Sequence, residues 1–334
     1  MTTTTTGALT REQLDQFHRD GYLLLPDFFD PAEPLAQARH LVKNFSLEDH
    51  PLTKFTNDLD DDRHARYFLE SGDKVRYFFE EGALGEDGQL NRPKDQAVNK
   101  VGHALHAHDP VFHRFSFSER LQNLARSLDA HRDPRVLQSM VICKPPAIGG
   151  AVPHHNDSTF LYTDPPSAIG FWFALEDCTR DNGCLSFMPG SHRWSKTHSD
   201  AKSAKASRPL EAEGVAREHG QPRGIDRRFV RRQPDGKGGT HFVDVDKGEE
   251  LEWSDEEAQI GECKAGTLVL IHGSVLHQSK MNLSDKSRYI YTFHMVEGDE
   301  SRARYDELNW LQPTEAMPFS QLYSPPPAPS SVQA

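Results

Sequence analysis

The sequence predicts a mainly β protein with flanking helices, whose core is a double-stranded β-helix of the jelly-roll type. Two observations predict this fold. Helical spacing of apolar residues is confined to the part of the chain before Asp129, and short apolar runs separated by glycine, proline and asparagine turns follow. Many short strands with irregular turns are typical of two sheets packed face to face. The expected strands are Val136 to Cys143, Ala168 to Leu175, Cys184 to Met188, Thr267 to Ile271 and Arg288 to Met295.

The expected helices lie ahead of these strands. Thr10 and Gln13 form a capping box, which predicts a helix start, and Gly21 is the residue type that ends one. The other expected elements are a strand over 22–25, a helix over 35–45, a polar surface loop over 46–66 and a helix over 121–128.

The domain organisation is predicted to be simple. We expect one domain over residues 9–323, interrupted by a long polar insertion over 195–260. Residues 1–8 and the proline-rich tail 324–334 are predicted to be disordered.

Composition and charge exclude several classes of protein. The net charge of −12 argues against nucleic acid as a partner, because phosphate binding needs a basic face. No run of eighteen apolar residues predicts a membrane span, and the threonine-rich start has neither the basic nor the apolar part of a secretory signal. The four cysteines lack CxxC spacing and are predicted to be reduced thiols. We therefore expect a cytoplasmic protein, and the net charge still allows a local basic site for an anionic ligand.

The segment 153–157 carries the first chemical signal. Alternate residues of a strand share a face, so His155 and Asp157 are predicted to point the same way. An imidazole and a carboxylate side by side are two of the three ligands of a facial triad, which leaves open positions on iron. His154 is an alternative ligand, although its odd offset from Asp157 places the two on opposite faces.

The second signal is an apolar strand that leads to His277, followed eleven residues later by Arg288. An arginine directed into a barrel is costly unless an anion meets it, and its planar fork matches a carboxylate. A structural salt bridge is the alternative role for Arg288. His272 is an alternative ligand to His277, but the register to Arg288 favours His277.

These two elements, together with several other stretches, resemble the phytanoyl-CoA dioxygenase family. The resemblance spans roughly residues 10 to 323 apart from the insertion. The stretches that carry it are SGDKVRYFFE at 71–80, NKVGHALHAHDPVF at 99–112, FLYT at 160–163, NGCL at 182–185, PGSH at 189–192, NLSD at 282–285 and NWLQPT at 309–314.

The resemblance implies an iron(II)- and 2-oxoglutarate-dependent dioxygenase that uses O₂ to hydroxylate a small organic substrate. It implies iron ligation by His155, Asp157 and His277. The 2-oxoglutarate contacts that it implies are Lys100, Met140, Trp172, Ser279 and Arg288. Alternatives are desaturation, cyclisation or epimerisation with the same cofactors, a non-catalytic barrel that binds metal or 2-oxoglutarate, and a zinc hydrolase, which would not need Arg288.

Overall fold

The computed structural model describes residues 7–54, 62–194, 227–235, 237–245 and 253–332. The helices are α1 (Arg11–Asp20), α2 (Ala32–Asn44), α3 (Asp62–Leu69), α4 (Leu105–His108), α5 (Pro110–Ser116) and α6 (Glu119–Leu128). The 3₁₀ turns are η1 (Glu81–Ala83), η2 (Lys94–Gln96), η3 (Asp157–Thr159) and η4 (Ser191–Arg193). The strands are β1 (Tyr22–Leu25), β2 (Val75–Phe79), β3 (Val98–His103), β4 (Pro134–Ile142), β5 (Val152–His155), β6 (Thr163–Asp164), β7 (Ile169–Ala174), β8 (Leu185–Phe187), β9 (Arg227–Arg231), β10 (Thr240–Asp244), β11 (Gln259–Gly261), β12 (Leu268–His272), β13 (His277–Ser279), β14 (Ile290–Glu297), β15 (Arg304–Tyr305) and β16 (Ser320–Gln321).

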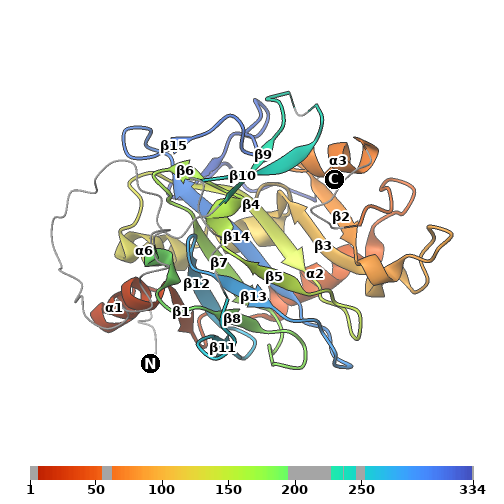
Figure 1. The fold of residues 1–334 in the computed structure, drawn as a ribbon, viewed down its shortest axis with the longest axis horizontal. Helices are drawn as coiled ribbons and strands as arrows, with labels where there is room; N and C mark the ends of the chain where they lie inside the picture. The colour runs from red at the N-terminus through yellow and green to blue at the C-terminus, as the bar shows by residue number, and fades with distance from the viewer. Residues whose placement is uncertain (1–6, 55–61, 195–226, 236, 246–252, 333–334) are drawn as a thin grey trace.

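Two antiparallel sheets form the centre of the molecule (Figure 1). The larger sheet has the order β1-β12-β7-β14-β4-β3-β2, with β16 paired to β4, and the smaller has the order β11-β8-β13-β5. A buried apolar cluster joins them, in which Trp172 and Ile290 of the larger sheet pack with Leu185 and Phe187 of the smaller. Two sheets packed in this way confirm the predicted jelly-roll core.

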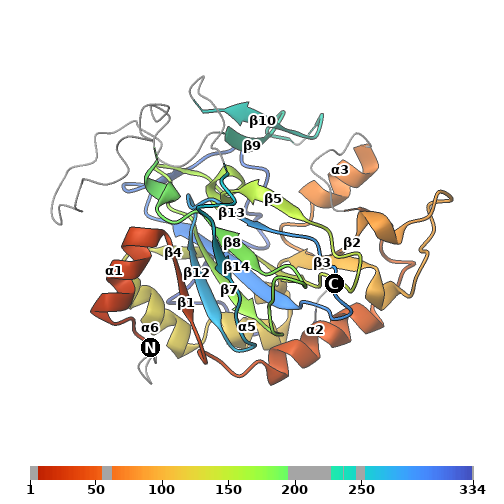
Figure 2. The ribbon, with the colours of Figure 1, turned by 60° about the horizontal axis from the view of Figure 1, so that its bottom comes forward.

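The larger sheet has one face toward the smaller sheet and one toward helices. Figure 2 shows α1, α2, α5 and α6 gathered along one side, with the hairpin β9–β10 on the opposite side. On the helical face Phe112 of α5 stacks on Tyr291 at 4.4 Å, and Phe293 stacks on Phe171 at 4.8 Å. Because side chains alternate along a strand, this packing directs the even-numbered residues of β14 toward the smaller sheet. The site is built on that inner face.

The first helix forms as the sequence predicts. The Thr10 side chain accepts from Gln13 N, and the Gln13 side chain accepts in return from Thr10 N. Gly21 ends the helix with φ +81°, a left-handed conformation that favours glycine. The strand β1 follows at once and adds to the edge of the larger sheet beside β12.

Several predicted boundaries differ from the structure. The loop over 46–66 is wrong at its end, because α3 begins at Asp62. The insertion over 195–260 contains the hairpin β9–β10, and β11 at its end pairs with β8 of the core. Residues 195–226 and 246–252 of that segment lie outside the described residues.

The two predicted disordered ends also make contacts where they are described. His113 Nε2 donates to the Pro326 carbonyl at 2.9 Å, and Val332 packs against the apolar core. At the other end Gly7 is buried, while residues 1–6 lie outside the described residues. Among the residues that the structure describes, no helix has the length and apolar character of a membrane span.

Candidate metal centre

Three side chains from two segments converge at the inner face of the smaller sheet. His155, Asp157 and His277 each offer a ligand atom, and these atoms lie within 4.8 Å of one another. Asp157 Oδ1 lies 3.7 Å from His155 Nε2 and 3.6 Å from His277 Nε2. These separations are longer than hydrogen bonds and suit donor atoms arranged around one cation.

Local backbone structure brings the three together. β13 pairs antiparallel with β5, and His277 lies directly opposite His155. The predicted strand through Asp157 ends earlier than expected, at His155, and Asp157 opens the 3₁₀ turn η3. Asn156 caps that turn, since its side chain accepts from Thr159 N at 3.0 Å. Asn156 therefore positions Asp157 without pointing at the other two ligands.

The two imidazoles are held in the tautomer that suits metal binding. His155 Nδ1 donates to the Pro153 carbonyl at 2.8 Å, and His277 Nδ1 donates to the Val275 carbonyl at 3.1 Å. Each ring then keeps Nε2 free as a lone-pair donor toward Asp157. Burial, together with the neighbouring His277 ring, lowers the pKa of His155 to about 4, so this ring is neutral near pH 7. A neutral imidazole is the form that binds a metal.

The carboxylate of Asp157 has a further partner. Its Oδ2 lies 3.1 Å from His294 Nε2, on the inner face of β14. Burial raises the pKa of Asp157, but the nearby His294 and His277 outweigh it and hold the pKa below its usual range. Gly170 leaves the space for this contact, because a Cβ there would lie 3.2 Å from both Asp157 Oδ2 and His294 Nε2.

The residues predicted to contact 2-oxoglutarate lie on neighbouring strands of the larger sheet and on β13. Met140, Thr292 and Trp172 are directly opposite one another across β4, β14 and β7 and therefore share a face. Lys100 and Ser279 are both buried, on β3 and β13.

Arg288 lies just before β14, not within it as predicted, and is only 2% exposed. Its Nη1 donates to the Gly183 carbonyl at 2.6 Å, and its guanidinium carbon lies 5.5 Å from the Trp172 ring centroid. Its Nε is buried without a hydrogen-bond partner, and among the described residues it forms no ion pair with a carboxylate. The predicted alternative role, a structural salt bridge, is therefore absent from the described part of the chain.

A second buried lysine stands beside Arg288. Burial and the neighbouring Arg288 lower the pKa of Lys144 to about 6, and burial lowers the pKa of Lys100 to about 7. Glu80 is the nearby carboxyl, and burial raises its pKa. Three basic side chains thus lie near one carboxyl, and a bound anion would favour the charged forms of both lysines.

The alternative ligands lie elsewhere. His154 stacks on Trp253 at 6.1 Å, and His272 packs against His192 at 4.8 Å. Neither belongs to the group of three that converges, so the geometry favours His155 and His277 over both.

The residues thus fit a divalent cation beside a carboxylate-bearing ligand. Two imidazole nitrogens and one carboxylate oxygen form the donor set of a non-haem iron site. Nearby, the buried Arg288 forms no ion pair with any carboxylate of the described residues. The fold and the site together define a double-stranded β-helix protein with a His-Asp-His cluster.

Comparison with known proteins identifies the family. The family model described as "Phytanoyl-CoA dioxygenase (PhyH)" matches residues 17–290. The chain is 38% identical to "Phytanoyl-CoA dioxygenase domain-containing protein 1" of Danio rerio, over 95% of this chain and 99% of that protein. It is 39% identical to "Phytanoyl-CoA dioxygenase" of Arabidopsis thaliana, over 92% and 95%. The chain therefore belongs to the phytanoyl-CoA dioxygenase family, as its sequence stretches predicted.

Solved structures agree on the fold. The non-heme alpha ketoglutarate dependent carbocyclase SnoK from nogalamycin biosynthesis matches with a TM-score of 0.53 and 18% identity, over 95% of this chain and 99% of that one. The apoform of EctD from S. alaskensis matches with a TM-score of 0.52 and 18% identity, over 97% and 89%.

Two residues of the site were missed in the sequence. Nothing in the sequence indicated the contact of His294 with Asp157, which depends on the pairing of β14 with β7. Lys144 follows an apolar strand and precedes two prolines, a context that gives no sign of burial.

Proposed function

We propose that this protein is an Fe(II)- and 2-oxoglutarate-dependent dioxygenase that hydroxylates a small organic substrate and releases succinate and CO₂. The observation that carries the proposal is the pairing of a His-Asp-His cluster with a buried arginine that forms no ion pair with the described residues. The family supports it, and so does the likeness to SnoK, which is described as alpha ketoglutarate dependent.

In this proposal His155, Asp157 and His277 hold the iron. The Nδ1 hydrogen bonds to Pro153 and Val275 fix both rings, so little reorganisation is needed when the metal binds. His294 orients the Asp157 carboxylate from behind. The bound iron supplies the activation of O₂, coupled to oxidative decarboxylation of 2-oxoglutarate.

The remaining residues hold the cosubstrate. Arg288 and Ser279 bind the carboxylate farther from the metal, and Lys100 adds positive charge. Met140 and Trp172 lie in one row of the inner face and form the apolar wall of this pocket. Together they orient the diacid and exclude water from the metal.

The hydroxylation outcome is the part least determined by these residues. SnoK is described as a carbocyclase, which makes cyclisation a second candidate outcome with the same cofactors. A non-catalytic binding barrel is a candidate of a different class.

Anaerobic addition of Fe(II) and 2-oxoglutarate tests the binding step. We expect a weak visible charge-transfer band that requires both additions. The catalytic step is tested by admitting O₂ with a metabolite library and measuring succinate and oxidised products by mass spectrometry. A charge-transfer band without succinate formation would favour the non-catalytic barrel. Zinc-dependent hydrolysis, with neither the band nor succinate, would favour a hydrolase.

A further inference from the structure

Lys144 occupies an unusual position for a lysine. It lies just after β4, and it is only 2% exposed. Its Nζ donates to Ser279 Oγ and to the Gly150 carbonyl, both at 2.7 Å. Both acceptors are neutral, and among the described residues Lys144 forms no ion pair. A lysine amine buried without an ion pair disfavours its charged form, and an anion that binds beside it would restore that charge.

The surrounding backbone is shaped to admit this side chain. A Cβ at Gly183 would lie 2.5 Å from Lys144 Cε, and a Cβ at Gly149 would lie 2.6 Å from its Cγ. Gly183 also has φ +80°, which disfavours other residues. Two turns that are distant in sequence thus form a slot for the Lys144 stem.

The same backbone couples Lys144 to Arg288. The Gly183 carbonyl accepts from Arg288 Nη1 at 2.6 Å, and Arg288 N donates to the Lys144 carbonyl at 3.2 Å. Arg288 lacks an internal anion among the described residues as well. The buried side chains of Lys144 and Arg288 are thus both held by the turn at Gly183. Together they form a site whose charge suits a carboxylate.

Lys144 also fixes the hydroxyl of Ser279. Because Ser279 Oγ accepts from Lys144 Nζ, the hydroxyl proton is directed toward another acceptor. Ser279 and His277 are two apart on β13, so they share the face that carries the metal ligands.

We propose that Lys144 is the second cation of a dicarboxylate anchor, which orients Ser279 as a donor to the far carboxylate and joins its charge to that of Arg288. This inference rests on the proposed function and deepens it. It predicts that the site selects doubly charged 2-oxo acids over singly charged ones, because only the former bring an anion to this end of the pocket.

The test compares Lys144→Met with Lys280→Met. Lys280 is exposed and next to Ser279, so its substitution removes the same charge without touching the slot. The dissociation constants of 2-oxoglutarate and of 2-oxobutyrate, which lacks the far carboxylate, are measured by anaerobic calorimetry on Mn(II)-loaded protein. We expect Lys144→Met to weaken 2-oxoglutarate binding by about 10- to 100-fold, the value of one or two charge-assisted hydrogen bonds. Its binding of 2-oxobutyrate, and both affinities of Lys280→Met, should stay at the wild-type level.

Thermal unfolding without cosubstrate supplies a second readout. A neutral methionine removes an uncompensated buried charge, so Lys144→Met should unfold at the wild-type temperature or above. Lys144→Gln keeps N–H donors but removes the charge, and it replaces the methionine variant if that protein fails to fold.

Unchanged 2-oxoglutarate affinity, or equal weakening for both oxo acids, would overturn the proposal. A wild-type protein that binds no 2-oxoglutarate would instead refute the proposed function itself.

Discussion

Two buried carboxylates near the larger sheet have opposite surroundings. Asp157 is 9% exposed and contacts His294 of β14, and Glu297, three residues farther along the same strand, is 4% exposed. Burial of either charge is costly unless partners compensate it. The groups that compensate the charge of Asp157 differ in chemical type from those that compensate the charge of Glu297.

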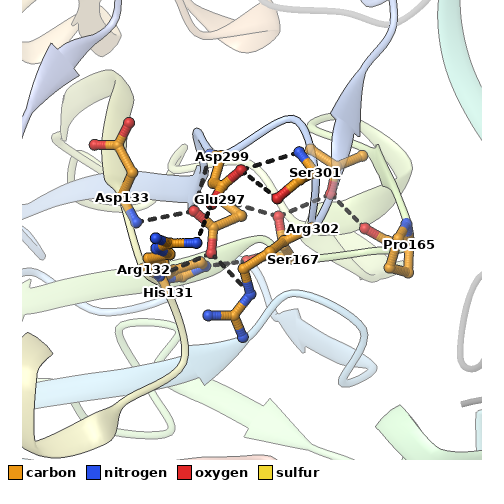
Figure 3. Close-up of polar contacts among 10 residues, drawn as sticks. His131, Arg132, Asp133, Pro165, Ser167, Glu297, Asp299, Ser301 and Arg302 are labelled. Carbon is orange, nitrogen blue, oxygen red and sulfur yellow. Dashed lines mark hydrogen bonds and ion pairs between the residues drawn. The ribbon is translucent and has the colours of Figure 1, made fainter. Parts of the chain in front are cut away.

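Glu297 is satisfied by the backbone (Figure 3). Its carboxylate accepts from Arg132 N at 2.7 Å, Asp133 N at 2.9 Å and Asp299 N at 3.0 Å. Arg302 approaches at 3.6 Å. This arrangement ties the turn before β4 to the turn after β14, and it offers no oxygen to a ligand.

Asp157 is surrounded instead by three imidazoles. Two of them, His155 and His277, face its Oδ1 with Nε2 atoms beyond hydrogen-bond distance. A backbone N–H has no lone pair to offer a metal ion, whereas an imidazole Nε2 without a proton has one. The contrast teaches that the nature of the donors, and not burial alone, separates a structural carboxylate from a ligand.

The largest expected effect comes from removing a ligand. His277→Ala should lower succinate formation from 2-oxoglutarate more than about 100-fold, because loss of a direct ligand exceeds the 10- to 100-fold cost of losing an outer partner. Glu297→Gln is the matched control and should retain turnover once folded. Equal losses in the two variants would abolish the distinction between the two carboxylates.

Arg288 tests the opposite end of β14 from Glu297. Arg288→Ala should raise the KM for 2-oxoglutarate by about 10- to 100-fold, since a charge-assisted anchor is lost, and should leave the KM for O₂ nearly unchanged. Steady-state kinetics with each cosubstrate varied in turn measures both. A parallel rise in both constants would point to a general disturbance of the site.

Much of the candidate metal site could be predicted from sequence because its signals are local. The two-residue spacing of His155 and Asp157 and the strand that leads to His277 are visible in single segments. The family resemblance supplied the other proposed cosubstrate contacts. Without it, His154 and His272 would have remained alternative metal ligands. The jelly-roll class followed from short apolar runs.

The parts that were missed depend on contacts between distant segments. The burial of Lys144 requires Gly183 from a distant turn, and the role of Glu297 requires two backbone segments to meet it. In the sequence, Lys144 and Glu297 are charged residues of the kind usually found at the surface. The 3₁₀ turn at Asp157 was missed because a strand pattern places the same side chains on one face.

Glu297→Gln should destabilise the fold without changing the metal site. The amide weakens three backbone hydrogen bonds to a charged acceptor, and we expect a loss of about 1.5–3 kcal/mol in the free energy of unfolding. Urea unfolding with an unchanged m-value measures it. Glu315→Gln, at an exposed position, is the control and should stay within about 0.5 kcal/mol of wild type. If the urea midpoint of Glu297→Gln equals that of wild type, the backbone N–H donors are hydrogen-bonded equally well by water.

The smallest expected effect is the pH dependence of the difference in unfolding free energy between wild type and Glu297→Gln. Burial raises the pKa of Glu297, but the N–H groups of Arg132, Asp299 and Asp133 outweigh it, so the folded-state pKa lies below the ordinary value of 4.5. A group with a depressed pKa stabilises the fold above its unfolded pKa, and this contribution is lost as the pH falls through the folded-state pKa. The gap in unfolding free energy between wild type and Glu297→Gln should therefore be full above the ordinary pKa of 4.5 and should narrow as the pH falls below it. Contributions from Asp157 are common to both proteins and cancel in the difference. A gap that stays constant across this range would mean that the carboxylate charge does not matter at Glu297, and its contrast with Asp157 would then rest on hydrogen-bond geometry alone.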